Sequence, residues 1–240
     1  MLPDSPLAPR SGDPDAEHTN EPSLRHRRRC GSEVVGLIAA FWGCSHLQAH
    51  AGLAITTQAI SDLTASAGRL TISGIGSWEA RGGATRRVRF KPSGLLTRVL
   101  NEPLCKHSRE LANVSPAGVH HLFHHVSSVR VPEDEIMSRV VMRGRANATD
   151  LHALMACRGM ITPTIAQNFM LSLKAVLREC LVEHHSVLIR GFGQFKIKDS
   201  PARTIRHPRT GEPLTVPAHR QLRFSIGQDF RRQLNHRSSD

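Results

Sequence analysis

The feature that most constrains how this chain folds is an internal repeat, which appears when the sequence is shifted against itself by 117 residues. The segment Leu70–Gly76, LTISGIG, then falls on Val187–Gly193, VLIRGFG. Both segments are short apolar runs that break at paired glycines, a pattern typical of a strand, a tight turn and another strand. Because several unlike signals coincide at this shift, the repeat predicts two copies of one small fold.

Candidate helix starts coincide at the same shift. Ser32 falls on Thr149 and Ser45 on Thr162, and each of these hydroxyl side chains is expected to cap a helix N-terminus. In the second copy the long helix is expected over about 163–182, with a proline in its first turn. Its apolar face predicts core or dimer interface and consists of Ile165, Phe169, Leu173, Val176, Leu177 and Cys180. The matching face of the first copy is smaller and consists of Ala51, Ile55, Ala59, Ile60 and Leu63.

The two copies differ by one insertion. Past the glycines the best shift becomes 134 residues, so that Phe90 falls on Phe224 and Asn101 on Asn235. The second copy therefore carries 17 additional residues between two of its strands. Each copy is predicted to contain a short helix, a long helix, two strands, a third strand and a closing helix. This order makes the fold class α+β, with a three-stranded antiparallel sheet in each copy.

The repeat divides the chain into five segments. We expect a disordered basic tail over 1–31, the first copy over 32–101, a histidine-containing linker over 102–148, the second copy over 149–235 and a short tail over 236–240. The first tail is too polar to bury a core. Its basic run contains four candidate phosphate contacts, Arg25, Arg27, Arg28 and Arg29. In the linker, the acidic turn PEDE predicts a local helix through Arg139, and not a third domain.

The charge of the chain favours a polyanionic partner. A formal net charge of +12 and a pI near 10.8 make nucleic acid the first candidate. Five cysteines without a close pair argue against a disulfide framework or a thiolate zinc site, and they favour a reducing compartment. The sequence has no run of about 18 apolar residues, as a membrane helix requires, and it does not begin with the pattern of a signal peptide.

From Val187 onward the sequence resembles the C-terminal half of the HU/integration host factor family of bacterial histone-like DNA-binding proteins. Three blocks carry the resemblance in the right order: GFGQF at Gly191–Phe195, ARTIRHPRTGEPLTVPA at Ala202–Ala218 and FSIGQDFRRQLN at Phe224–Asn235. The first copy keeps GIGSWE, RRVRFKPS and LLTRVLN but lacks the arm sequence. The resemblance implies tandem HU-like domains, the first of them armless. It also implies a non-enzymatic, nucleoid-associated function in which double-stranded DNA is bound, bent and condensed.

The resemblance also implies which residues contact DNA. Arms of this family enter the minor groove with a proline wedged between base steps, and Pro208 matches that proline. From the residues alone, this proline serves equally well to start a turn. The rest of the predicted arm supplies Arg203, Arg206, His207, Arg209, Thr210, Gly211 and Arg220, with the arginines expected on one charged face. Because the minor groove distinguishes base pairs only weakly, binding is expected to follow the shape and flexibility of DNA.

The bodies of both copies are expected to extend this basic track. The second copy supplies Lys196, Lys198, Arg223, Arg231 and Arg232. The first copy supplies Arg86, Arg87, Arg89, Lys91 and Arg98. The cations of the first copy fit phosphate contacts and a solvated strand edge that discourages aggregation equally well.

Other classes of function fit the residues less well. RGFGQF approximates an RNA-stacking signature, but Gln194 takes the place of an aromatic residue, and two helices precede the strands. RNA binding through charge and groove shape stays open, as does a protein-interaction scaffold that uses the fold for dimerisation. The glycine pairs lack the context of a dinucleotide loop, so neither catalysis nor a cofactor is expected. The linker histidines have helical spacing but no thiolates or HExxH motif beside them, so we expect no metal at His120, His121, His124 and His125.

Two ways of pairing the copies are open. They pair with each other inside one chain, as a one-armed pseudo-dimer, or across chains, as a two-armed homo-oligomer. The linker reaches far enough for either arrangement, and we predict the intramolecular pair. The family resemblance implies the cytoplasm and the bacterial nucleoid, with an organelle or a phage as alternatives.

Overall fold

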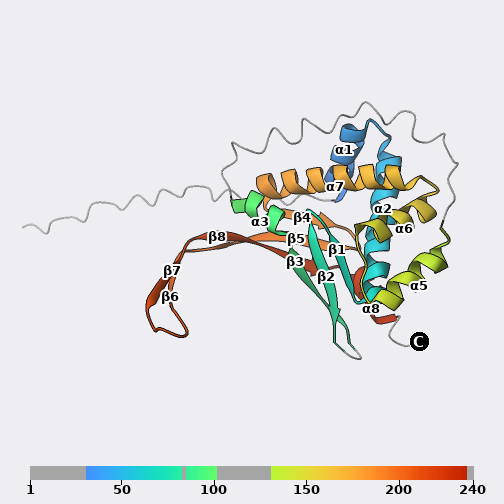
Figure 1. Ribbon diagram of the computed structural model, residues 1–240. Helices are drawn as coiled ribbons and strands as arrows, with labels where there is room; N and C mark the ends of the chain where they lie inside the picture. The colour runs from blue at the N-terminus through green and yellow to red at the C-terminus, as the bar shows by residue number, and fades with distance from the viewer. Residues whose placement is uncertain (1–30, 83–84, 102–130, 237–240) are drawn as a thin grey trace, which may run out of the picture.

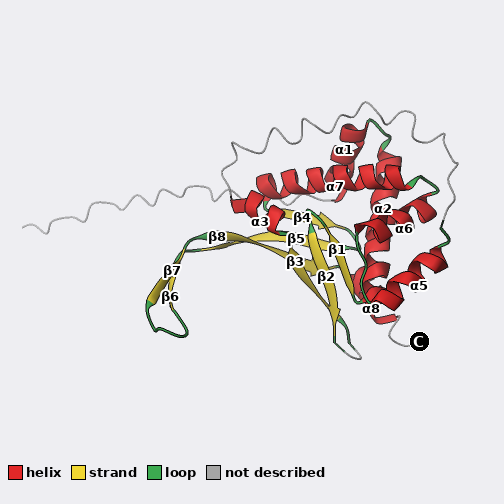
Figure 2. Ribbon diagram, viewed as in Figure 1, coloured by secondary structure: helices red, strands yellow, loops and turns green. Residues whose placement is uncertain are grey.

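The computed structural model describes residues 31–82, 85–101 and 131–236, which form one α+β body with a projecting β-ribbon (Figure 1). The long helices lie on one side of the body and the strands of both sheets on the other (Figure 2). None of the helices in the described part of the chain has the length and apolar character needed to cross a bilayer.

The body has two halves. The first half, residues 31–101, contains α1 (Gly31–Trp42), α2 (His46–Ala67), β1 (Arg69–Ile72), β2 (Gly76–Arg81), β3 (Arg87–Pro92) and α3 (Gly94–Asn101). The second half, residues 148–236, contains α6 (Ala148–Gly159), α7 (Pro163–His184), β4 (Ser186–Ile189), β5 (Gly193–Ser200), β6 (Arg203–Arg206), β7 (Pro213–Val216), β8 (His219–Ile226) and α8 (Gln228–His236). The sheets have the orders β1-β2-β3 and β4-β5-β8, and β6 pairs with β7 alone. Apart from β6 and β7, the halves show the same element order.

Matching elements keep the shift of the sequence repeat. Helices α1 and α6 have 12 residues each, and α2 and α7 have 22 each. Strands β2 and β5 begin at Gly76 and Gly193, whose φ angles are 154° and 155°. A Cβ atom at Gly76 would lie 2.3 Å from the carbonyl oxygen of Lys91, and one at Gly193 would lie 2.4 Å from that of Ser225. Only glycine fits at both positions, because a side chain would meet the backbone of the neighbouring strand.

The predicted N-caps of the two long helices are confirmed. The hydroxyl of Ser45 accepts a hydrogen bond from the backbone N–H of Gln48 at 3.2 Å, in a capping box. The hydroxyl of Thr162 accepts from the backbone N–H of Ile165 at 3.3 Å. Pro163 occupies the first turn, as predicted. These caps fix where the long helices begin in both halves.

The predicted N-caps of the two short helices are wrong. Helix α6 is capped by Asn147, whose side chain accepts from the backbone N–H groups of Thr149 and Asp150. Thr149 therefore lies inside the helix. Ser32 also lies inside its helix, because α1 begins at Gly31. An asparagine two residues before Thr149 reaches the same unpaired N–H groups, and asparagine is among the best capping residues.

The apolar face predicted for α7 is buried along its whole length. The face predicted for α2 is partly wrong, since Ala51 is exposed and Ile55 only half-buried. Instead, the buried face of α2 begins at Ala49 and Leu53 and then includes the predicted positions from Ala59 onward. Small residues recur at several spacings in α2, so packing against α6 and α8 selects the face.

One hydrophobic cluster joins the two halves. Helix α1 packs on α7 and α2 packs on α6, so the short helix of each half packs on the long helix of the other. Below them, the rings of Phe90 and Phe224 meet with centroids 5.7 Å apart. These residues are equivalent in the repeat, and contact between equivalent residues places them next to a pseudo-two-fold axis. In this structure the two halves therefore pack against each other around one shared core.

Part of the predicted linker belongs to the body. Helix α5 (Glu133–Arg143) includes the predicted helix and continues four residues beyond Arg139. It packs on α2 and buries Ile136 and Val140. At its first turn, the guanidinium of Arg158 lies 2.6 Å from Glu133 and 2.7 Å from Asp62 of α2. The tail arginines and the four linker histidines named above lie outside the described residues.

Candidate nucleic-acid interface

The ribbon of β6 and β7, called here the arm (residues 201–218), leaves the body where β5 ends and β8 begins (Figure 1). Its register pairs Arg203 with Val216 and Arg206 with Pro213. Every residue from 201 to 215 is exposed. Since the ribbon has no core behind it, both of its faces are available to a partner.

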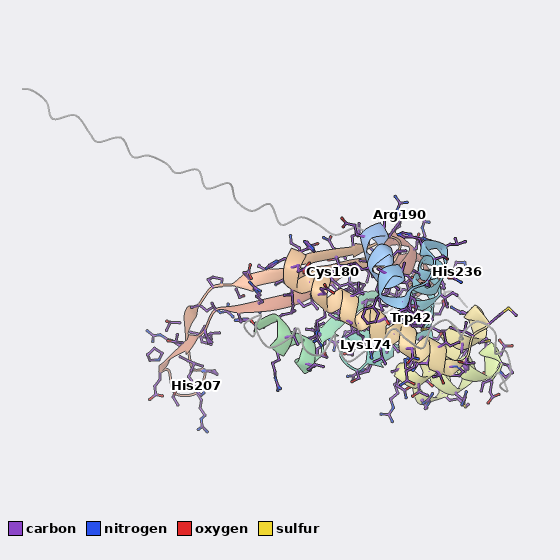
Figure 3. The ribbon with its side chains drawn as sticks, turned by 90° about the horizontal axis from the view of Figure 1, so that it is seen from above. Trp42, Lys174, Cys180, Arg190, His207 and His236 are labelled. Carbon is purple, nitrogen blue, oxygen red and sulfur yellow. The ribbon has the colours of Figure 1, made fainter. Side chains whose placement is uncertain are left out.

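The tip of the arm is a compact turn. The backbone N–H of His207 donates to the carbonyl of Glu212, and that of Gly211 donates to the carbonyl of His207, both at 2.9 Å. Gly211 has a φ of 73°, which favours glycine. The Nδ1 atom of His207 accepts from the backbone N–H groups of Arg209 and Thr210 at 3.4 and 3.3 Å. This turn holds Pro208 exposed at the far end of the arm, where Figure 3 labels its neighbour His207.

The prediction that the arm arginines share one face is wrong. Side chains alternate across a strand, so Arg203 and Arg206 lie on opposite faces of the ribbon. Ile205 shares the face of Arg203 and pairs with Leu214, and these two apolar side chains are 38% and 49% exposed. Each face of the arm therefore carries a cation, and one face also carries an exposed apolar pair.

Below the arm, a group of cations lies on the outer sides of the two sheets. The inner sides are fixed by Trp78, Phe90, Phe195 and Phe224, whose rings contact one another between the sheets and the helices. Alternation then directs the intervening residues outward. We call this outward surface the basic face; its cations are Arg69, Arg81, Arg87, Arg89, Lys91, Lys196, Lys198 and Arg223.

The backbone register brings these cations side by side. Lys196 of β5 stands directly opposite Arg223 of β8. In the first half, Arg81 of β2 stands opposite Arg87 of β3. Strands β3 and β8 are neighbours along the line where the two sheets meet, so the two sets form one surface.

The pKa of Glu79, an acid on the first-half part of the basic face, reflects the positive charges around it. Its carboxylate lies 3.0 Å from the guanidinium of Arg81. The hydrogen bond from Arg81, helped by the charges of Arg69 and Arg89, lowers the pKa of Glu79. The carboxylate stays ionised, and the cations around it outnumber it.

Sequence reasoning missed two residues of the basic face, Arg69 and Arg81. The signal that would have found them is the period of two in a strand. Arg69 precedes the buried Leu70, and Arg81 is three positions after the buried Trp78, so both fall on the outer side.

Two predicted arginines do not lie on the basic face. Arg86 donates from its guanidinium to the carbonyl of Ala65 at 2.9 Å, at the end of α2. Arg220 is opposite Asp199 in the ladder and forms an ion pair with it at 3.4 Å. By the alternation of side chains along a strand, both arginines fall on the inner side of their sheet. Both stand at the end of a strand, beyond the hydrophobic core, and their side chains therefore bind polar groups of the body.

Three other predicted arginines lie on closing helices. Arg98 is exposed on α3, and Arg231 and Arg232 are exposed on α8. Arg232 lies 3.7 Å from Asp229 one turn earlier. Among the described residues, no group of three or more His, Cys, Asp and Glu side chains comes together as a metal site would require.

The second half is similar to known proteins. The family model described as "Bacterial DNA-binding protein" matches residues 146–235. Integration host factor subunit alpha of Psychrobacter cryohalolentis is 44% identical over 64 residues, which cover 27% of this chain and 65% of the relative. Integration host factor subunit beta of Halorhodospira halophila is 39% identical over 59 residues, which cover 25% of this chain and 58% of the relative. The chain thus spans less than two thirds of the length of these relatives.

Among solved structures, the chain is similar to the one titled "Anabaena HU-DNA cocrystal structure". The match covers 37% of this chain and 96% of that chain, with 28% sequence identity and a TM-score of 0.34.

Proposed function

Because residues 146–235 match the family model described as "Bacterial DNA-binding protein" and are similar to integration host factor subunits, we propose that this chain binds double-stranded DNA on its basic face and bends it with its single arm. The observation that carries the proposal is the exposed arm, which holds Pro208 at its tip beyond a continuous basic face. The proposal contains no catalytic step.

The two-faced arm suits the minor groove. A ribbon inside a groove has a phosphate backbone on either side, so Arg203 and Arg206 on opposite faces each reach one wall. The apolar pair of Ile205 and Leu214 faces sugar and base edges, and the ring of Pro208 enters a base step. Unstacking a step costs a few kcal/mol, which is offset when bent DNA contacts more of the basic face.

Pairing of the halves within one chain gives a protein with one arm. One wedge kinks DNA on one side of the body, while the first half holds the other side by charge alone. The active unit is then a monomer. In sedimentation the protein at low concentration should run with the mass of one chain; a stable two-chain species would refute this unit.

Binding of this kind follows shape more than sequence. The minor groove offers little beyond the difference between A·T and G·C pairs, and phosphate contacts carry no base information. A packaging role in the bacterial nucleoid fits such binding.

A titration of a short DNA duplex tests the proposal. The intact protein is compared with a variant that lacks residues 203–216, with fluorescence transfer between the DNA ends and a series of salt concentrations. The deletion should keep a folded body, because the first half closes the same position with a short hairpin. We expect the intact protein to bend the duplex and the deletion to bind, with weaker affinity, without bending.

Pro208→Ala separates the wedge from the rest of the arm. This variant should keep the salt dependence of binding and lose most of the bend. Equal binding without bending by the intact protein and the deletion would refute the arm mechanism.

A further inference from the structure

Asn101, the last residue of α3 in the first half, contacts the root of the arm in the second half. Its side-chain oxygen accepts a hydrogen bond from the backbone N–H of Arg220 at 2.7 Å. Its side-chain nitrogen donates to the carbonyl oxygen of Arg220 at 3.1 Å. One amide thus satisfies both backbone groups of one strand residue, as a neighbouring strand would.

These bonds lie where the body ends and the arm begins. The ladder between β5 and β8 ends with the pair of Ser200 and His219, and the arm ladder begins with Arg203 and Val216. Arg220 is one residue inside the end of the body ladder, and Asn101 binds its backbone from the side opposite β5. The arm, which has no core behind it, takes its direction from this root.

The opposite end of the body carries the equivalent contact in a weaker form. Asn235, which matches Asn101 at the shift of 134 residues, accepts from the backbone N–H of Arg86 at 2.8 Å. Arg86 matches Arg220 at the same shift. The side-chain nitrogen of each asparagine also donates to the carbonyl four residues earlier in its own helix, that of Asn101 to Thr97 at 2.8 Å and that of Asn235 to Arg231 at 3.0 Å. The nitrogen of Asn101 donates to Arg220 of the other half as well. The short hairpin therefore receives one bond from the other half, and the arm receives two.

We infer that Asn101 is a positioning residue for DNA bending: the armless half fixes the direction of the arm through this side chain. The predicted effect of Asn101 on DNA bending rests on the proposed function. Its predicted effect on the motion of the arm does not, and can be measured in the free protein. A small rotation at Arg220 is magnified at Pro208, because the whole length of the ribbon separates them.

The free protein gives the first test, with Asn101→Ala and the matched control Asn235→Ala. Loss of the hydrogen bond that the Arg220 N–H donates should speed hydrogen exchange at this amide by about fivefold to tenfold. Backbone relaxation should show greater motion of residues 203–216 relative to the body. Asn235→Ala should speed exchange at Arg86 and leave the arm unchanged. Asn101→Asp keeps an acceptor for Arg220 and should restore most of the protection at that amide.

The bound complex gives the second test. With Asn101→Ala the bend measured by fluorescence transfer should decrease and become more variable, while the dissociation constant rises by less than about fivefold, as expected for one lost interaction. Asn235→Ala should bend DNA as the parent does. Unchanged arm motion in Asn101→Ala, or an equal loss of bend in both variants, would overturn the inference. A parent protein that does not bend DNA would refute the proposed function, while arm motion in the free protein would still decide the role of Asn101.

Discussion

The two halves of this protein keep the same core and present different surfaces. Their first two helices have equal lengths, and their sheets place glycines at the same sharp turns. Outside the core, the second half extends the arm between β5 and β8, whereas the first half joins β2 to β3 by a short connection. Packing therefore holds the repeat constant, whereas a hairpin tip, which packs on nothing, is free to differ.

The surfaces of the halves also differ in charge. On the basic face the first half contributes five cations from its sheet, Arg69, Arg81, Arg87, Arg89 and Lys91. The second half contributes three from its sheet, Lys196, Lys198 and Arg223, together with the arm. On the basic face the half without an arm thus contributes more cations, which suits the proposed division, in which the first half holds DNA by charge and the second half inserts the arm.

The sharpest test of the shared core is a matched pair of truncations. Trp78 and Phe195 occupy equivalent positions, and both are almost fully buried in the aromatic cluster. Trp78→Ala and Phe195→Ala should each lower the free energy of unfolding by about 3–5 kcal/mol. Denaturation followed by circular dichroism should show one transition in each variant. Two separated transitions would show that the halves fold independently.

The paired glycines Gly76 and Gly193 test whether the backbones of the two halves are equally constrained. Gly76→Ala and Gly193→Ala each place a methyl group against a carbonyl oxygen of the adjacent strand at a positive φ. Each should destabilise the protein by at least about 2 kcal/mol, and by similar amounts in the two halves. Urea denaturation of both variants measures the difference. A neutral substitution in one half alone would show that this half has room that the other lacks.

The charge comparison is tested by two triple variants. Replacing Arg87, Arg89 and Lys91 by serine removes three cations from the first half, and the matched set in the second half is Lys196, Lys198 and Arg223. If each cation meets one phosphate, each triple variant should reduce the slope of log binding constant against log salt by about 2 to 3. Bending by the first variant should persist at low salt. A slope unchanged by the first-half set would confine DNA to the second half.

The smallest expected effect concerns His152 of α6, which stands where the first half has the buried Val35. Burial, followed by the nearby charge of Lys174, lowers the pKa of His152 below its ordinary value of 6.5. The unfolded chain then binds the proton more readily than the folded chain, so stability is lost as pH falls through about 6.5. His152→Val should reduce this acid-induced loss. Thermal denaturation at pH 7.5 and pH 5.5 checks it, and an unchanged pH dependence would count against a role for this side chain.

Much of the fold could be predicted from the sequence because the repeat doubles every local signal. The element order, the caps of the long helices and the buried face of α7 all depend on residues close together in the chain. The docking of α5 on α2 carried no such signal. It includes the contacts of Arg158 with Glu133 and Asp62, which lie 25 and 96 residues away, and only the folded chain brings these side chains together.

The candidate site was predicted in composition but not in orientation. The arm and its tip were recognisable from residues, whereas the faces of Arg203 and Arg206 required the strand register. Arg86 and Arg220 look like DNA contacts in a list of cations, yet the structure turns one to Ala65 and the other to Asp199. Whether such an arginine faces outward depends on its position in the alternation along the strand, and a count of charges does not give that position.

Because both halves belong to one chain, any substitution in this body occurs once. In a dimer of identical subunits the same mutation alters both ends at the same time, so the ends cannot diverge. Here the contact of Phe90 with Phe224 keeps the ends together while each end evolves alone. In the proposed complex with DNA, the end with the arm and the end without it are then distinct along the duplex, so the complex has a polarity.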